Sequence, residues 1–147
     1  MRMSSKGRYA VVAVLDVAGN AGAKPVSLAD VAVRQRISLS YLEQLFAMLR
    51  RAGLVAASRG PGGGYRLQRP AGEITVGQVF QAVDDPGAST ENGARDWSEG
   101  PAAGLWDALD AHIERFLERV TLADLLSGSY KRAFALDAAE ERQSLSA

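Results

Sequence analysis

A glycine-dense segment, Gly60-Pro61-Gly62-Gly63-Gly64, separates two short strand-like runs, Leu54–Arg59 and Tyr65–Leu67. Glycine and proline at this density favour a tight turn, so the two runs are predicted to pair as a β-hairpin. No Gly-Lys-Ser/Thr sequence follows the glycines and no helical pattern opens after them, which argues against a phosphate-binding loop. The chain is therefore predicted to contain one small β element, and the rest of the fold must come from helices.

Three helical patterns precede the hairpin. Apolar residues at helical spacing predict a buried first helix over Ser5–Ala18. Ser27 caps a short second helix that ends at Arg34–Arg36, and the turn Ile37–Ser40 leads into a third helix over Ser40–Ala52. Three helices followed by a hairpin is the order of a winged helix-turn-helix domain, with the third helix as its recognition helix.

The remaining chain contains a short helix, a polar stretch and a long helix. Thr75, with Gln78 at the third position, opens a helix through Val83. Residues 84–104 are rich in small and acidic residues and are predicted to form an irregular loop. Helical spacing returns from Leu105 to Val120. After it come a short helix capped by Thr121 over Leu122–Leu126 and a polar tail with helical character around Ala133–Gln143.

The absence of net charge hides a strong asymmetry. Residues 1–72 carry 11 basic and 3 acidic side chains, a net charge of +8, whereas residues 73–147 carry 6 and 14, a net charge of −8. A half-molecule this basic is typical of a protein that binds a polyanion such as nucleic acid. The alternative is a dipolar protein whose two halves attract each other.

Several classes of site are excluded by composition. The chain has no cysteine and one histidine, His112, which removes disulfides, thiolate nucleophiles and thiolate-ligated metal sites. No combination of nucleophile, base and orienting residue is visible, so an enzyme is not expected. The longest apolar run, Tyr9–Leu15, is too short to span a bilayer, and the basic N-terminus lacks a cleavage pattern. We expect a soluble cytoplasmic protein that does not interact with membranes.

The start of the third helix carries side chains suited to base edges. Residues there meet the major groove in helix-turn-helix proteins, and they are Ser38, Ser40, Tyr41, Glu43 and Gln44. A serine hydroxyl can bond phosphates or bases, a glutamine can pair with adenine, and a glutamate can accept from cytosine N4. The alternative for Glu43 is a purely structural role, completing a capping box with Ser40.

The hairpin turn carries the second candidate contact. Glycines such as Gly60 let a backbone approach DNA closely, and Arg59 beside them would suit the negative potential of a minor groove. The alternative is a plain turn with incidental arginines. A winged helix can also serve as a protein-interaction module, but the polar recognition residues and the arginine favour DNA.

Three motifs resemble one known family. They are Ser4-Ser5-Lys6-Gly7-Arg8-Tyr9-Ala10, Ile37-Ser38-Leu39-Ser40-Tyr41-Leu42-Glu43-Gln44-Leu45-Phe46 and Arg59-Gly60-Pro61-Gly62-Gly63-Gly64-Tyr65. Together they resemble the IscR-type iron–sulfur cluster regulators, winged helix-turn-helix transcription factors related to NsrR and CymR. The likeness runs from Met1 to about Asp84. It resumes at Leu105-Trp106 and at Val120–Leu125.

The resemblance implies a function and a set of site residues. It implies a homodimeric repressor that binds a palindromic DNA operator of iron–sulfur or iron-responsive genes. The implied DNA-binding residues are Ser38, Ser40, Tyr41, Glu43, Gln44, Arg59 and Gly60, with Lys6, Arg8 and Tyr9 near the DNA backbone. Glu43 matches the family position that discriminates between two operator classes.

The same resemblance implies a division of the chain. Residues 1–83 would form the winged helix-turn-helix DNA-binding domain and residues 84–104 a flexible effector loop. Residues 105–129 would hold a long dimerisation helix and a short helix, and residues 130–147 a C-terminal tail. The expected fold class is mainly α with a small β-hairpin. Trp106 is interpreted as an anchor of the dimer core.

The loop departs from the family at its cofactor site. Cluster-bearing members hold a [2Fe–2S] cluster with three cysteines and a histidine there, but this loop has no cysteine and Ala102 at the histidine position. No cofactor is therefore predicted, whether the cysteines were lost naturally or replaced. As an alternative function, the loop would sense another metal or a small molecule. The acidic residues that would supply oxygen ligands, unless they are simply solvated, are Asp84, Asp85, Glu91, Asp96 and Glu99.

Two further residues have open interpretations. His112 is either an ordinary surface or interface residue of the long helix or a pH- or ligand-sensitive group at a dimer interface. Trp97 would either pack the loop against the winged helix or stack on a small effector.

Overall fold

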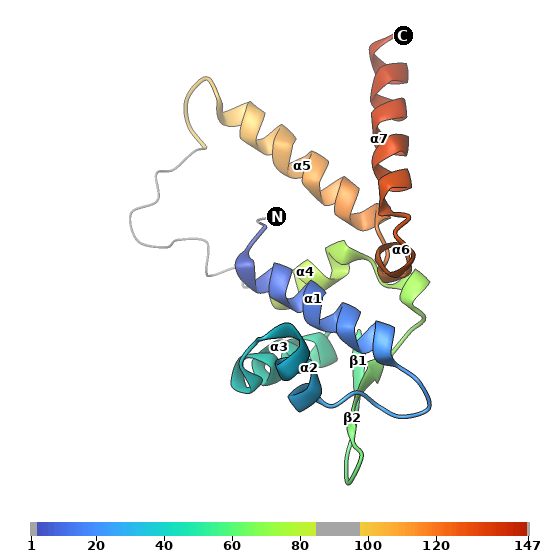
Figure 1. Cartoon of the computed structure of the whole chain (residues 1–147). Coiled ribbons are helices and arrows are strands. Elements are labelled where there is room, and N and C mark those ends of the chain that lie inside the picture. The colour runs from blue at the N-terminus through green and yellow to red at the C-terminus, as the bar shows by residue number, and fades with distance from the viewer. Residues whose placement is uncertain (1–2, 85–97, 147) are drawn as a thin grey trace.

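The N-terminal half of the chain folds as three helices and a hairpin, as the sequence predicts. A computed structural model describes residues 3–84 and 98–146, except for the side chains at 132–134, 136–138, 140 and 141. Figure 1 shows the elements in chain order: α1 (Ser5–Asn20), α2 (Leu28–Gln35), α3 (Leu39–Arg51), β1 (Val55–Ser58), β2 (Gly64–Leu67), the 3₁₀ turn η1 (Ala71–Glu73) and α4 (Val76–Val83). The predicted fold class, mainly α with a small hairpin, is confirmed.

Helices make up the second half of the described chain. They are α5 (Ala103–Arg119), α6 (Leu122–Ser127) and α7 (Tyr130–Leu145). In Figure 1, α5 and α7 extend away from the body on the side opposite the hairpin. The part of the predicted loop at residues 85–97, which includes Trp97, Asp85, Glu91 and Asp96, lies outside the described residues.

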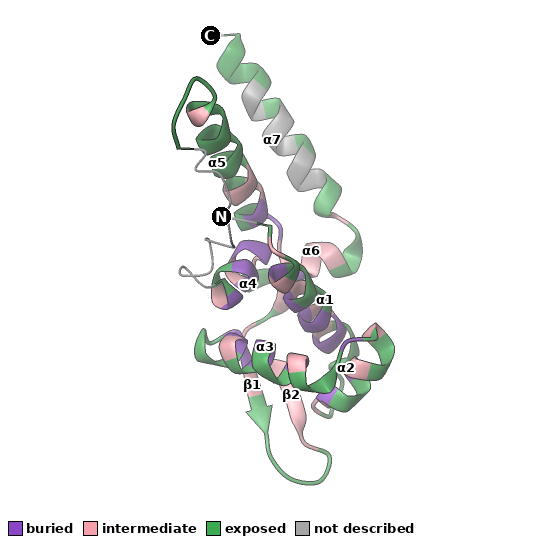
Figure 2. Cartoon of the chain, turned by 90° about the vertical axis from the view of Figure 1, so that its left-hand side faces the viewer, coloured by how far each residue is buried: buried purple, intermediate pink, exposed green. Residues whose placement is uncertain are grey.

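Helix α1 is the centre of the core. It buries Ala10, Ala13, Val14 and Val17 completely, and α3 packs its own apolar face against the same cluster. Small residues let neighbouring helices approach α1 closely. A Cβ on Gly7 would lie 2.5 Å from Cε1 of Phe80 on α4, so this crossing requires glycine. Figure 2 shows the resulting purple core along α1, α3 and α4 and the mostly green outer part of α5.

Helix starts follow the predicted caps at all but one position. Ser27 and Thr75 cap α2 and α4, and the predicted Thr75–Gln78 capping box is present. The exception is α3, which begins at Leu39 rather than at Ser40, because the Ser38 hydroxyl accepts the Tyr41 N–H at 3.3 Å. A cap satisfies an otherwise unpaired helix donor, and Ser38 does this two residues before the predicted position.

The two C-terminal helices are longer than the sequence pattern indicates. α5 begins at Ala103, two residues before the apolar spacing starts at Leu105, and α7 spans sixteen residues where helix was expected only around Ala133–Gln143. The sequence of α7 is rich in alanine, glutamate, arginine and lysine, which favour helix without any apolar stripe, so periodicity alone underestimates this segment.

The hairpin is anchored to the segment before α2. β1 and β2 pair antiparallel in the register Val55↔Leu67 to Ser58↔Gly64. Tyr65 then forms a bridge to Val26. The Tyr65 N–H donates to the Val26 carbonyl at 2.7 Å, and the Val26 N–H donates to the Tyr65 carbonyl at 2.9 Å. A Cβ on Gly64 would collide with the Val26 carbonyl, so the bridge requires glycine at this position.

A second bridge joins the two halves of the chain. The Val76 N–H donates to the Val120 carbonyl at 2.8 Å, and the Leu122 N–H donates to the Ile74 carbonyl at 2.9 Å. Thr75 and Thr121 lie opposite each other in this bridge, and each begins a helix with a complete capping box. The start of α6 is thereby fixed to the start of α4. Within the described residues, no helix has both the length and the apolarity needed to cross a membrane.

Candidate nucleic-acid interface

One face of α3 is core and the other is polar and open to solvent. Leu42, Leu45, Phe46 and Leu49 are fully buried. The predicted recognition residues Ser38, Ser40, Glu43 and Gln44 are all exposed, and Tyr41 is half-buried at the flank. A helix with one buried stripe presents its remaining side chains together. The structure therefore brings the predicted recognition residues onto one continuous surface.

The capping role considered for Glu43 is not what the structure shows. Ser38 is the cap of α3, so Ser40 lies inside the helix and cannot form a capping box with Glu43. Within the described residues, the Glu43 carboxylate makes no hydrogen bond or ion pair. Its acceptor oxygens are left open toward solvent at the start of the helix.

Tyr9 connects α1 to this surface. Its ring meets the ring of Tyr41 edge to face, with centroids 5.8 Å apart and planes at 89°. Such contacts add to the free energy gained by burying the rings and restrict their orientation. Burial, with a smaller contribution from Tyr9, raises the pKa of Tyr41 above its ordinary value. Like any tyrosine at neutral pH, Tyr41 is a phenol that can donate a hydrogen bond.

The other two predicted residues of α1 are Lys6 and Arg8. Lys6 is half-buried. Arg8 is exposed and lines an apolar groove together with residues of α1, α4, α5, α6 and α7. The structure brings Tyr9 to the recognition helix, but it does not bring Arg8 there.

The turn of the hairpin projects from the body at the end opposite α5 and α7 (Figure 1). Arg59 and Gly60 are exposed at its base. The Gly63 N–H donates to the Gly60 carbonyl at 2.9 Å, and Gly62 has a φ of +76°, so Pro61-Gly62 occupies the centre of the turn as in a type II turn. The tip of the hairpin is therefore narrow backbone with the Arg59 side chain beside it. A tip of this shape can enter a DNA minor groove.

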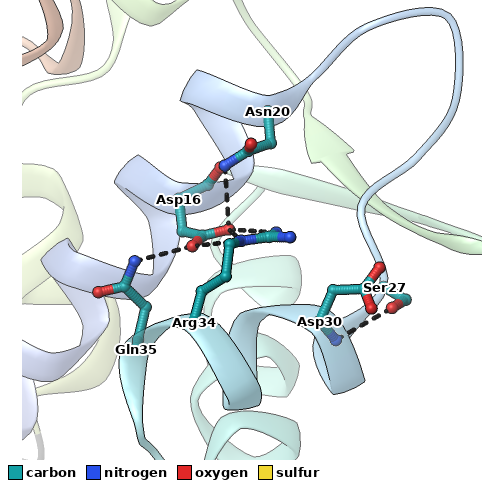
Figure 3. A network of polar contacts seen from close by, with 6 residues as sticks. All are labelled: Asp16, Asn20, Ser27, Asp30, Arg34 and Gln35. Carbon is teal, nitrogen blue, oxygen red and sulfur yellow. Dashed lines mark hydrogen bonds and ion pairs between the residues drawn. The ribbon is translucent and has the colours of Figure 1, made fainter.

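An ion pair with a buried carboxylate fixes α2 against α1, just before the recognition helix. Arg34 donates to both carboxylate oxygens of Asp16, and Gln35 Nε2 donates to Oδ2 at 2.8 Å, as Figure 3 shows. Asn20 Nδ2 approaches Oδ1 at 3.4 Å from one helical turn further along α1. Arg36, at the C-cap of α2, has a left-handed φ of 56° and starts the turn toward α3. Sequence reasoning treats Arg34 only as a helix-end residue and misses its partner, because Asp16 lies 18 positions away.

The donors available for a metal or cluster do not fit a thiolate-ligated iron–sulfur site. The sequence has no cysteine. Its one histidine, His112, is exposed on α5 with Nδ1 3.2 Å from Nη2 of Arg115. Asp84 and Glu99 are exposed, and no group of three or more potential ligands occurs among the residues that the structure describes. Iron in a thiolate cluster requires sulfur ligands that this chain cannot supply.

An apolar groove and an apolar helix face lie away from the recognition surface. The groove measures 310 Å³ and is lined by Met3, Arg8, Val11, Val12, Val76, Phe80, Phe116, Leu117, Val120, Leu125 and Tyr130. The first turns of α5 leave Leu105 60% exposed, Trp106 39% and Leu109 48%. Large apolar side chains gathered at this density on a surface indicate a contact with another molecule.

Comparison with known proteins identifies the family. The Rrf2 family, described as iron-dependent transcriptional regulators, matches residues 3–128. The chain belongs to the Rrf2 family. Its place there confirms the predicted resemblance to IscR-type regulators. It also makes the chain a DNA-binding transcriptional regulator rather than an enzyme.

Individual Rrf2 relatives show how far the likeness extends. The chain is 52% identical over 130 residues to the HTH-type transcriptional regulator IscR of Photobacterium profundum, covering 86% of this chain and 76% of the relative. Among solved structures, T. potens IscR has a TM-score of 0.72 at 39% identity, with 88% of each chain covered. CymR, the global cysteine regulator of B. subtilis, has a TM-score of 0.71 at 36% identity, covering 86% of this chain and 97% of that one.

Proposed function

We propose that this Rrf2 protein is a homodimeric repressor that binds a palindromic operator of iron–sulfur or iron-responsive genes. The observation that carries the proposal is the exposed face of α3. The side chains of Ser40, Glu43 and Gln44 are exposed there, and residues 1–72, to which they belong, carry a net charge of +8. Polar side chains with open donors and acceptors are what base readout needs, and the surrounding cations favour the phosphates.

Each contact has a distinct role in this proposal. Ser38, Ser40 and Gln44 bond phosphates or bases, Tyr41 donates from its protonated phenol, and Glu43 accepts from a cytosine N4. Arg59 enters the adjacent minor groove, where the narrow turn at Gly60 allows close approach. Tyr9, beside Tyr41, lies near the DNA backbone, and Lys6 and Arg8 contribute positive charge to the DNA-binding half. Phosphate contacts fix the position of the domain, and base contacts select the sequence.

The second copy of the chain is the proposed occupant of the apolar surface around α5. Leu105, Trp106 and Leu109 are exposed near one end of a helix whose other end is packed on α4. A twofold dimer is self-complementary, so this one surface covers itself when two copies meet. Two recognition helices held this way read two half-sites, which is why the operator is expected to be palindromic.

The proposal that the target genes respond to iron rests on the description of the family as iron-dependent regulators. The iron–sulfur cofactor of cysteine-bearing members is not proposed for this chain. The chain lacks sulfur ligands, so we propose that it binds DNA without a thiolate-ligated cluster. Iron in the growth medium would then change operator binding only through another molecule or through the abundance of this protein.

The test is selection of bound sequences from random DNA by the purified dimer, with and without iron. A palindrome protected over about 25 base pairs, with log affinity falling by several units per decade of salt, is expected. Absorption spectra of anaerobically purified protein should show no thiolate–iron bands. Binding that ignores salt, or selection that yields no palindrome, would refute the proposal.

A further inference from the structure

Leu39 is a large apolar side chain that α3 leaves in solvent. It is the first residue of the helix, directly after the cap Ser38, and it is 43% exposed. The other leucines of α3, which are Leu42, Leu45 and Leu49, are all 0% exposed. Exposing an apolar side chain of this size gains nothing for the stability of the isolated chain, since its burial would be favourable. Packing within the described chain covers only part of this side chain, and the exposed part is available for contact with another molecule.

The position of Leu39 is shared with the polar recognition residues. In an α-helix, residues four apart lie on the same face, so Leu39 lies one turn from Glu43 and beside Ser40. Both of these side chains are exposed. The N-terminal turn of a recognition helix is the part that meets base edges in the major groove. Leu39 thus brings an apolar group into a set of hydrogen-bonding groups.

We propose that Leu39 is a specificity-determining residue that contacts the C5-methyl group of a thymine in each half-site. The inference rests on the proposed function. The thymine methyl is the apolar group that a base pair presents in the major groove, and side chains recognise it through apolar contact. Bringing the isobutyl group of Leu39 against it removes both from water. Cytosine, adenine and guanine offer no such group at that edge.

The test uses the operator selected by the full-length protein. Each thymine is replaced in turn by deoxyuridine, which lacks the methyl group and keeps all hydrogen-bonding atoms. The wild-type protein should lose about fourfold in affinity at one thymine per half-site, the effect expected for one buried methyl group. Leu39→Ala should bind the thymine and deoxyuridine operators equally at that position. Leu39→Met, which keeps an apolar side chain of similar length, should remain sensitive.

Val33→Ala is the matched control. Val33 is a branched apolar residue on α2 that is 80% exposed, so its truncation tests whether losing any exposed apolar group changes the response. This variant should keep the wild-type sensitivity to deoxyuridine. Thermal unfolding of each variant reports whether α3 is intact, independently of DNA.

The outcomes separate the two levels of the hypothesis. A wild-type protein that binds its operator and tolerates deoxyuridine at every position would overturn the thymine contact alone. So would a Leu39→Ala variant with undiminished sensitivity at the same position. A protein that binds no DNA sequence would overturn the thymine contact together with the proposed function.

Discussion

Arg34 binds the carboxylate of Asp16 through two nitrogens, Nε at 3.0 Å from Oδ2 and Nη2 at 2.7 Å from Oδ1, across the contact between α1 and α2. The Asp16 side chain is 1% exposed while that of Arg34 is 40% exposed, so the anion is buried and the cation closes over it (Figure 3). Donors from Arg34, Gln35 and Asn20 satisfy the buried carboxylate, whereas a buried carboxylate without donors would destabilise the folded state. The pair fixes the end of α2 just before the turn into the recognition helix.

Asp16→Asn should destabilise the protein at neutral pH by about 1–3 kcal/mol, because it removes charge-assisted hydrogen bonds from a buried site. The bond from Arg34 is the main cause that lowers the Asp16 pKa below the ordinary value of 3.8. A lowered pKa stabilises the fold at pH values above 3.8 and loses that effect as the pH falls through the folded-state value. The gap between wild type and variant should therefore narrow in acid. Urea unfolding between pH 7 and pH 2 measures it.

Asp84→Asn is the control for that experiment. Asp84 is exposed at the C-cap of α4 and is remote from the ion pair. The unfolding free energy of the Asp84→Asn variant should stay within about 0.5 kcal/mol of the wild-type value at every pH, as for most surface substitutions. A gap for Asp16→Asn that is the same at pH 7 and in acid would contradict the ion-pair explanation.

Two serines near the start of α3 should behave differently. Ser38→Ala removes the hydroxyl that accepts the Tyr41 N–H, so it should cost about 1 kcal/mol of stability. Ser40→Ala removes an exposed hydroxyl inside the helix and should leave stability unchanged. Both should weaken operator binding if both contact DNA. Thermal unfolding and operator titration of the two variants, run in parallel, separate capping from recognition; equal stability losses would contradict the assignment of Ser38 as the cap.

Local chemistry explains which features could be predicted from sequence. The caps at Ser27 and Thr75 and the glycine turn depend on residues within a few positions, and their predicted places agree with the structure. Features that depend on distant partners were not predictable. The Asp16–Arg34 pair and the Tyr65–Val26 bridge join segments separated by 18 and 39 positions, and nothing local marks either one.

The candidate site shows the same division. The recognition surface could be predicted because helical periodicity alone decides which side of α3 is apolar. The choice between Ser38 and Ser40 as the cap could not be made, since serine is a good cap at either position. The sequence pattern places Leu39 in the turn Ile37–Ser40, and only its exposed fraction in the structure distinguishes it from the other leucines of α3.

Gly64→Ala should destabilise the wing by roughly 1–3 kcal/mol, the usual cost of forcing atoms into filled space. Its new Cβ would collide with the Val26 carbonyl and lie 2.8 Å from the Ser27 nitrogen, both of them backbone atoms. Gly22→Ala is the matched control, because its Cβ would meet nothing within 4 Å. Urea unfolding compares the two variants. A neutral Gly64→Ala would mean that the hairpin is not held against the Val26 segment in solution.

Glu43→Ala should broaden sequence choice more than it lowers affinity. Removing the open carboxylate deletes an acceptor for cytosine N4, so discrimination at that base pair should fall by roughly fivefold or more. It also removes a negative charge that is unfavourable beside phosphates, which limits the loss of overall affinity. Arg59→Ala is the contrasting variant and should weaken every operator by a similar factor. Selection from random DNA with each variant measures both quantities, and an unchanged base preference for Glu43→Ala would remove Glu43 from base readout.

Leu109→Glu should dissociate the proposed dimer. Leu109 is 48% exposed on the apolar side of α5, and a carboxylate there would have to be buried without a partner when two copies meet. Losing one such apolar contact corresponds to a rise of roughly 10- to 100-fold in the dimer dissociation constant. Ala111→Glu is the charge-matched control, because Ala111 is exposed and two residues further on, on the opposite side of the helix. Sedimentation equilibrium should show a monomer for Leu109→Glu and an unchanged dimer for Ala111→Glu, and operator affinity should fall only for the former. A Leu109→Glu protein that still dimerises and binds as wild type would place the dimer contact elsewhere than on this face of α5.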